Sequence, residues 1–253
     1  MRLDQWLVKS KLAPSRTKAQ ELIRGGQVEV LVRDQWELIF QPSFIMNKAF
    51  QARLLSAKLL RYVSRAGLKM EGALEHLGLD VKGLRALDIG ISTGGFSDCL
   101  LKKGCHSVVG IDVGQGQLHS RLRDHPCLID FEGLHFKDIS DHAEFQNLLG
   151  KGFSLVVLDV SFCSLTQVMP YLPPVLSQEG IVLALVKPQF EVGAENLNKA
   201  GVVKDSGLYR QVEVKICDCV NALGFEVKDY FPSQLRGTGG NQEYFLFLHW
   251  RHQ

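Results

Sequence analysis

Four short apolar runs, separated by stretches of helical periodicity, constrain the fold of this chain more than any other feature. The runs cover residues 84–89, 107–112, 153–158 and 181–186. Such alternation is typical of parallel strands joined by crossover helices. Two later runs, at about 225–231 and 244–250, lie close together and can pair antiparallel. The residues from 67 onward therefore predict a doubly wound α/β domain with a mostly parallel sheet.

The first residues follow a different pattern and predict a small α+β unit. Leu3, Trp6 and Leu7 recur at helical spacing before Pro14. A second helical stripe contains residues 19, 22 and 23, and alternating valines at 28, 30 and 32 then indicate a strand. Residues 41–62 show little periodicity and are interpreted as a linker or an irregular edge.

The charge of the chain is unevenly distributed. The net formal charge is +2, but residues 1–65 hold 12 Lys/Arg against 5 Asp/Glu, and the remaining residues hold 17 against 22. A basic unit beside a mildly acidic body predicts that the first part binds a polyanion such as nucleic acid. The alternative is a solvated charged face without a partner.

The composition argues against a membrane or disulfide-rich protein. The apolar run 181–186 is far shorter than the roughly 20 residues that span a bilayer, and the opening residues form no secretory signal. The 6 cysteines contain no C-x-x-C pair and no evident histidine partner spacing, so we expect reduced thiols and no metal site. A cytoplasmic location is the expectation.

A glycine-rich loop lies between the first apolar run and a helical stretch. It reads Asp88-Ile89-Gly90-Ile91-Ser92-Thr93-Gly94-Gly95-Phe96. Such a loop lets the backbone approach a ligand closely. Asp112 ends the next run, 22 residues after Gly90, where an acidic side chain commonly binds ribose hydroxyls. Because the spacing is not G-x-G-x-x-G and the loop is acidic, S-adenosylmethionine (SAM) fits better than a dinucleotide, although such a turn can also be purely structural.

Charged residues follow two of the predicted strands. Asp159 comes directly after the run 153–158, and Lys187 directly after the run 181–186. Because open α/β sheets bind ligands beyond the carboxyl ends of their strands, both side chains are expected near the glycine-rich loop. Lys69, on the helix before the first strand, and Glu243, at the start of the last, can complete the group.

Two lysines and two carboxylates suit the methylation of a hydroxyl. A ribose 2′-hydroxyl is a poor nucleophile, so a positioned lysine has to accept or loosen its proton during in-line attack on the methyl group. The carboxylates orient that lysine and hold its charge state. Each residue also has an ordinary interpretation: Lys69 as a solvated helix lysine, Asp159 as a helix cap, and Glu243 as a carboxylate facing water.

A series of short motifs runs along nearly the whole chain. The first are Arg2-Leu3-Asp4-Gln5, Ala13-Pro14-Ser15-Arg16 and Lys18-Ala19-Gln20. The body adds Tyr62-Val63-Ser64-Arg65-Ala66-Gly67-Leu68-Lys69, Asp112-Val113-Gly114, Asp159-Val160-Ser161-Phe162, Val186-Lys187-Pro188-Gln189-Phe190-Glu191, Gly201-Val202-Val203 and Gly240-Asn241. In this order the motifs resemble the TlyA family, bacterial proteins labelled hemolysins that act as 2′-O-methyltransferases on ribosomal RNA.

The resemblance implies an S4-type RNA-binding domain at residues 1–60, a linker at 61–66, and an FtsJ-like, Rossmann-like SAM-dependent methyltransferase domain at 67–253. It implies a Lys-Asp-Lys-Glu tetrad, here Lys69, Asp159, Lys187 and Glu243. It also implies cytidine 2′-hydroxyls of 16S and/or 23S rRNA as substrates and ribosomal subunits as partners. A monomer without membrane contact is the default expectation.

The sequence and the resemblance together give two further sets of candidate residues. The cofactor-binding set is Asp88, Gly90, Ser92, Thr93, Gly94, Gly95, Phe96, Asp112 and Glu132. The last opens Glu132-Gly133-Leu134-His135, where the family often has Glu-Arg-Thr-Asn. The RNA-binding set is Arg2, Lys9, Lys11, Arg16, Lys18 and Arg24.

Three other functions stay open. The hemolysin label suggests a membrane-lytic protein, but no span or long cationic amphipathic helix supports it. A ribosome-associated RNA-binding factor without methyltransferase activity is the second. Methylation of a base nitrogen is the third, and such sites commonly carry an Asn/Asp-Pro-Pro-Tyr loop, whereas residues 159–162 contain no proline.

Overall fold

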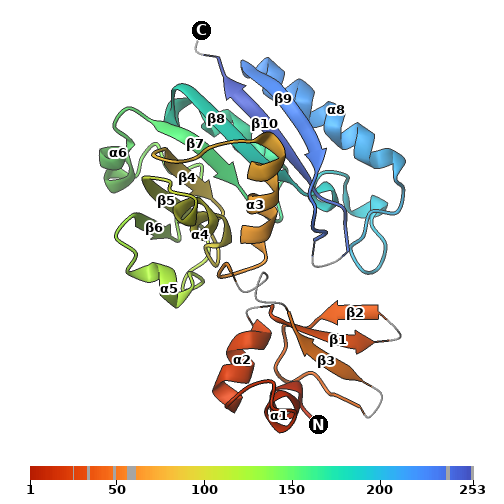
Figure 1. Cartoon of the computed structure of the whole chain (residues 1–253). Helices are drawn as coiled ribbons and strands as arrows, with labels where there is room; N and C mark the ends of the chain where they lie inside the picture. Colours follow the sequence, from red (N-terminus) through yellow and green to blue (C-terminus); the bar gives the residue numbers. More distant parts are fainter. Residues whose placement is uncertain (25, 33–34, 48–49, 56–60, 238–239, 252–253) are drawn as a thin grey trace. The chain divides into compact units, whose positions relative to one another are not determined.

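The computed structural model describes the whole chain except residues 25, 33–34, 48–49, 56–60, 238–239 and 252–253. The chain forms two compact units, Met1–Leu68 and Lys69–Gln253 (Figure 1). Residue 60, the predicted end of the first domain, lies outside the described residues. The boundaries of the RNA-binding part and the linker therefore stay a prediction.

The first unit is built as its sequence pattern predicts, from two helices and a small antiparallel sheet of order β2-β1-β3. Its elements are α1 (Leu3–Lys9), α2 (Arg16–Arg24), β1 (Val28–Val32), β2 (Gln35–Leu38) and β3 (Gln51–Leu54). Leu3 and Leu7 pack with Ile23 and the buried valines of β1 in one core. The edge strand β3 falls within the stretch interpreted as a linker or irregular edge, because only two of its four residues are apolar.

A seven-stranded sheet of order β6-β5-β4-β7-β8-β10-β9 forms the centre of the second unit. Its strands are β4 (Arg85–Ile89), β5 (Ser107–Asp112), β6 (Leu128–Glu132), β7 (Phe153–Leu158), β8 (Leu176–Val186), β9 (Phe225–Pro232) and β10 (Tyr244–Trp250). The strands from β6 to β8 are parallel, and β10 pairs antiparallel with both β8 and β9. The predicted α/β fold is confirmed, including its antiparallel last pair.

Helices cover both faces of this sheet (Figure 1). They are α3 (Ala66–Leu77), α4 (Gly95–Lys102), α5 (Ser120–Arg123), α6 (Ala143–Leu149), α7 (Leu165–Val168) and α8 (Gly207–Ala222), with short 3-10 turns η1 (Met169–Tyr171), η2 (Pro173–Val175), η3 (Pro188–Phe190) and η4 (Ala194–Asn196). On one face, Phe96 of α4 and His76 of α3 stack on the β-strand residues Phe245 and Phe231. The other face packs against α6, α7 and α8.

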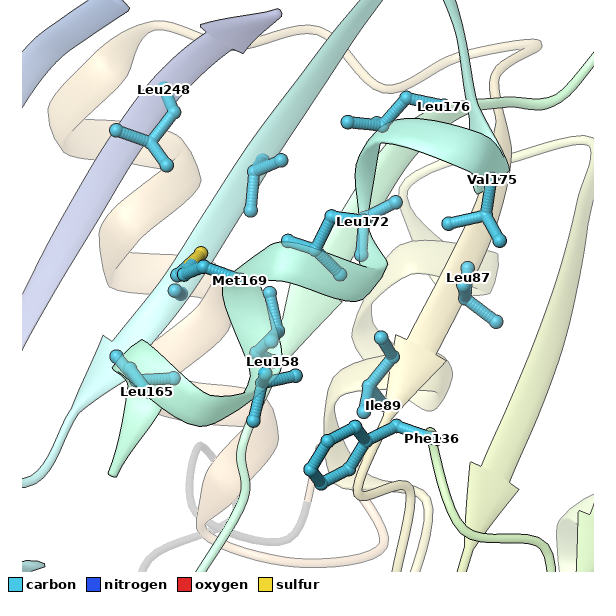
Figure 2. Packing of buried hydrophobic residues seen from close by; sticks show 14 of the residues in the cluster. Leu87, Ile89, Phe136, Leu158, Leu165, Met169, Leu172, Val175, Leu176 and Leu248 are labelled. Atoms are coloured by element: carbon cyan, nitrogen blue, oxygen red, sulfur yellow. The ribbon is translucent and has the colours of Figure 1, made fainter. Parts of the chain in front are cut away.

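The apolar core on that second face fixes the segment that follows β7. Figure 2 shows Leu165, Met169 and Leu172, from α7 and its continuation, lying over the strand residues Leu158 and Ile89. All five side chains are 2% exposed or less. Burying each of them contributes roughly 1.5–3 kcal/mol, so the chain that follows the end of β7 is held firmly against the sheet.

The strand order reverses between β4 and β7, the third and fourth strands of the sheet. Chain segments leaving these two strands diverge to opposite sides, which opens a crevice at their carboxyl ends. The glycine-rich loop follows β4, and Asp159 follows β7. The topology therefore places both at the position where open α/β sheets bind ligands.

Candidate active site

A cavity of about 470 Å³ lies at the carboxyl edge of the sheet. This volume is typical of sites that bind small organic molecules. Its walls come from the ends of β4, β5 and β7 and from the loop after β6. The lining residues are Ile89, Gly90, Ser92, Ile111, Asp112, Val113, Gln117, Leu134, His135, Phe136 and residues 159–163.

The glycine-rich loop passes so close to the neighbouring strand end that it needs its first glycine. Gly90 has a φ of +86°, and a Cβ atom there would lie 3.0 Å from the backbone oxygen of Asp159. A side chain at this position would be strained and would push against backbone. The absence of a side chain at Gly90 thus allows the chain segments after β4 and β7 to lie close together where they line the cavity.

Asp112 closes the same loop from the end of β5. Its Oδ2 accepts a hydrogen bond from the backbone N–H of Ser92 at 2.8 Å, and its Oδ1 accepts one from Gly114 at 2.7 Å. A carboxylate has about four acceptor positions, so both oxygens can accept further bonds. Since Asp112 lines the cavity, it can hold ribose hydroxyls there.

Of the predicted cofactor-binding residues, Gly90, Ser92 and Asp112 line the cavity. Four of the others lie at the start of α4: Thr93 and Gly94, which has a φ of +86°, precede the helix, and Gly95 and Phe96 are its first residues. Glu132 is exposed at the end of β6, where it pairs with Asp112 in the parallel ladder. Asp88 lies inside the protein, where its Oδ2 accepts bonds from the backbone N–H and the hydroxyl of Ser97 in α4.

Asp88 is 1% exposed, and its Oδ1 has no hydrogen-bond partner among the described residues. Burial, with a smaller contribution from the negative charges of Asp159 and Asp112, raises the pKa of this carboxyl to about 7. The hydrogen bonds from Ser97 lower the pKa but do not outweigh the burial. In the folded chain Asp88 therefore holds its proton at pH values where the unfolded chain has lost it. The free energy of unfolding consequently falls as the pH rises from about 4 to about 7.

Asp88→Asn is expected to remove this pH dependence, because the amide oxygen can still accept the Ser97 bonds and does not ionise. Relative to the native chain, the variant gains up to about 4 kcal/mol of stability between pH 4 and pH 8. Urea unfolding at a series of pH values measures the difference. The exposed Asp141→Asn variant is the control, and parallel curves for Asp88→Asn and the native chain would contradict the assignment.

Lys187 lies directly beyond β8 and forms an ion pair with Asp159 beyond β7. The Nζ–Oδ1 distance is 2.7 Å, and the two side chains are 12% and 19% exposed. The same ammonium donates to the hydroxyl of Ser161 at 2.8 Å. A charged pair this shielded from water interacts more strongly than a surface pair.

A second ion pair joins Lys69 of α3 to Glu243, the residue before β10. Their Nζ–Oε2 distance is 2.5 Å, with exposures of 12% and 3%. A Cβ atom on Gly237 would lie 2.4 Å from the Glu243 carboxylate, so that glycine leaves the space the carboxylate occupies. The pairing gives Lys69 a fixed position that its place on a helix did not predict.

The sheet brings both pairs to one edge. Tyr244 of β10 faces Val186 of β8 in the antiparallel ladder, so the next residues outward are Glu243 and Lys187. In the parallel ladder between β7 and β8, Leu158 pairs with Ala184, which puts Asp159 at this edge too. Asp159, Lys187 and Glu243 thus lie at neighbouring strand ends, and Lys69 reaches Glu243 from α3, so the four residues form two lysine–carboxylate pairs.

Several residues of this region escaped sequence reasoning. Gln117 accepts a hydrogen bond from the Ser92 hydroxyl at 2.9 Å, and His135 contributes to the cavity wall. Phe162 is 91% exposed with a φ of +64°, and its ring lies 5.2 Å from that of Phe190. In the sequence, its only signal was an aromatic residue directly after Ser161. The loop conformation decides its exposure.

In the first unit, a fully buried carboxylate organises two of the predicted RNA-binding residues. Asp4 accepts hydrogen bonds from Arg2 at 3.1 Å, Arg16 at 3.0 Å and Gln20 at 2.9 Å. Burial alone would raise the pKa of Asp4, but these donors outweigh it and lower the pKa well below its usual range. The two arginine side chains stay 39% and 54% exposed and can reach a ligand.

The other four predicted RNA-binding residues are exposed on the same two helices or between them. Lys9 ends α1, Lys11 follows it, and Arg24 ends α2. Lys18 pairs with Glu21 at 2.8 Å on the surface of α2, a contact worth little in water. All six therefore present positive charge from one helical pair.

Two protein families match the chain. The FtsJ-like methyltransferase family matches residues 62–250, and the S4 domain matches residues 1–30. Among the described residues, no helix is long and apolar enough to cross a bilayer.

Individual relatives match over nearly the full length. The 16S/23S rRNA (cytidine-2′-O)-methyltransferase TlyA of Mycobacterium tuberculosis is 36% identical over 98% of this chain and 89% of its own. The 23S rRNA (cytidine-2′-O)-methyltransferase TlyA of Campylobacter jejuni is 33% identical over 98% of each chain. A solved structure from Streptococcus thermophilus that carries the name hemolysin covers 100% of this chain and 89% of its own, with 33% identity and a TM-score of 0.74.

Proposed function

Because this chain belongs to the TlyA family of FtsJ-like methyltransferases, we propose that it transfers a methyl group from SAM to a ribose 2′-hydroxyl of cytidine in ribosomal RNA. The observation that carries the proposal is the pair of buried lysine–carboxylate contacts beside a cavity that offers a ribose-binding carboxylate. The names of the two TlyA relatives support cytidine 2′-hydroxyls as the acceptor.

The cavity fits SAM in size and in chemistry. Asp112 offers its carboxylate to ribose hydroxyls, while Leu134 and Phe136 provide apolar surface suited to a purine ring. Gly90 and Ser92 let the backbone lie close to the ligand. When bound there, SAM supplies an electrophilic methyl group on a sulfonium.

The remaining predicted cofactor residues act by shaping this cavity rather than by lining it. Asp88 holds the first turn of α4 through Ser97, and Gly94 leaves room for Leu122, whose side chain would lie 2.4 Å from a Cβ there. Phe96 packs on the sheet behind the loop. We propose that these residues, with Thr93, Gly95 and Glu132, keep the loop in its binding conformation.

Lys187 is the proposed general base. As the free amine it takes the proton of the attacking hydroxyl at Nζ, and Asp159 stabilises the ammonium that results. Lys69, fixed by Glu243, places a second positive charge at the same edge, where it can stabilise oxygen as negative charge develops. Positioning and proton transfer together, rather than either alone, then carry the acceleration.

The first unit is proposed to bind the RNA. Arg2, Arg16 and the four exposed basic residues of the same helices would contact phosphates, which gives affinity that falls with salt concentration. The exposed ring of Phe162 beside the cavity offers a stacking surface for a base turned out of its helix. Ribosomal subunits are the proposed partners, and the relatives' names leave 16S and 23S rRNA as candidate targets.

Methyl-labelled SAM, incubated with the full chain and unmodified 30S or 50S subunits, tests the proposal. Methylation of a 2′-hydroxyl blocks alkaline cleavage of the next linkage, so label in alkali-resistant dinucleotides is the expected result. The labelled subunit identifies the target. Label on a base would replace the proposal with base methylation, and bound SAM without label on either subunit would favour an RNA-binding factor without this activity.

A further inference from the structure

Lys187 has an acceptor besides Asp159. Its ammonium lies 2.8 Å from the Ser161 hydroxyl, close to the 2.7 Å that separates it from the Asp159 carboxylate. The contact with the backbone oxygen of Asp159, at 3.5 Å, is much weaker. The amine is thus held by an ion pair with the Asp159 carboxylate and by a directional hydrogen bond to the Ser161 hydroxyl.

The loop that carries Ser161 is itself fixed at both ends. At its far end, Glu191 accepts hydrogen bonds from the Ser164 hydroxyl at 2.5 Å and the Leu165 backbone N–H at 2.7 Å. Glu191 is 1% exposed and pairs in turn with Lys215 of α8. Residues 159–164 are therefore held between Lys187 at one end and Glu191 at the other, which sets the position of the Ser161 hydroxyl.

The geometry of an amine gives this second contact a role. A free lysine amine has two N–H bonds and one lone pair, and it rotates freely about the Cε–Nζ bond when nothing holds it. Ser161 accepts one N–H in a directional hydrogen bond, whereas the contact with Asp159 Oδ1 is an ion pair without hydrogen-bond geometry. The bond to Ser161 therefore restricts the direction of the lone pair. Both acceptors line the cavity, so the amine is held between two side chains of the reacting region.

We infer that Ser161 is a positioning residue for Lys187, which fixes the amine through its hydroxyl so that the lone pair meets the acceptor hydroxyl. The inference rests on the proposed function and adds a residue to the four-residue group. The ion pair with Asp159 alone supplies charge but leaves the Lys187 amine free to rotate about its Cε–Nζ bond. Ser161 removes that freedom without adding a second negative charge.

Ser161→Ala and Ser161→Thr test the inference in the full chain, with Ser140→Ala, at an exposed serine before α6, as the matched control. A hydrogen bond to a charged group is worth enough that its loss should lower kcat roughly 10- to 100-fold in the alanine variant. The Kd for SAM, measured by calorimetry, should stay within about two-fold of the native value, because the Ser161 hydroxyl is engaged by Lys187 and the proposed ribose contact belongs to Asp112. Threonine keeps the hydroxyl and should restore most of the rate.

Native kcat in Ser161→Ala would overturn the inference. Weaker SAM binding together with no rescue by threonine would also overturn it, since Ser161 would then be part of the cofactor site. Both results differ from a failure of the proposed function, in which the native chain itself transfers no label.

Discussion

Lys187→Ala is expected to lower the rate of methyl transfer by about 10²–10⁴-fold, the usual contribution of a positioned general base. The variant loses the amine that accepts the proton and leaves Asp159 without its cation. SAM affinity should change little, because Lys187 is not among the residues that line the cavity. Single-turnover rates with labelled SAM, together with calorimetric SAM binding, separate the two effects.

The matched control for this variant is Lys151→Ala, which removes an exposed lysine in the turn before β7. It should transfer methyl groups at the native rate. If Lys187→Ala kept native activity while binding SAM normally, Lys187 would not be the base, and Lys69 would become the candidate.

Asp4→Ala is expected to unfold the first unit and to abolish RNA binding while leaving SAM binding intact. Asp4 is fully buried and accepts bonds from two arginines and a glutamine, so its removal should lower the stability of this small unit by about 3 kcal/mol. A unit with so small a core has little stability to lose. The cavity lies wholly in the second unit and should keep its ligand.

Hydrogen exchange on the full chain measures the Asp4 effect, since fast exchange confined to α1, α2 and β1 would mark local unfolding. The control is Glu29→Ala, which breaks the more exposed Arg53–Glu29 pair and should cost at most about 1 kcal/mol. Protection of these elements at the native level in Asp4→Ala would contradict the prediction.

The lowered pKa of Asp4 predicts that acid also destabilises the first unit of the native chain. Because the folded pKa is lowered, the carboxylate stabilises the first unit above about pH 4, and this stabilisation is lost as the pH falls toward the folded value. The pH dependence of Asp88 has the opposite sign, since its folded pKa is raised.

Much of the fold could be predicted because its strands are buried on both faces. The strands β4, β5 and β7 and the second half of β8 are mainly apolar and buried, and such runs are recognisable without any knowledge of their neighbours. Strands β3 and β6 lie at sheet edges, where half of each strand faces water, and their sequences lack that signal.

The site was predictable where a charged residue directly follows a buried strand, as at Asp159 and Lys187. The position of a candidate residue was less predictable where it depends on a contact with a distant part of the chain. Lys69 and Glu243 lie 174 positions apart, and only the sheet register and the position of α3 bring them together. Asp88 shows the converse, because its place in a glycine-rich loop suggests ligand contact while its side chain is turned into the protein.

The sequence by itself determined the alternation of the buried strands with helices, the basic first unit and the family, because hydrophobic periodicity, charge and contiguous motifs are local properties of the chain. Only the tertiary structure decided which side chains meet. The pairing of Lys187 with both Asp159 and Ser161, and the burial of Asp4 under two arginines, depend on how separate segments pack. Contacts across the chain are set by packing and sheet register, and neither is encoded at any single position.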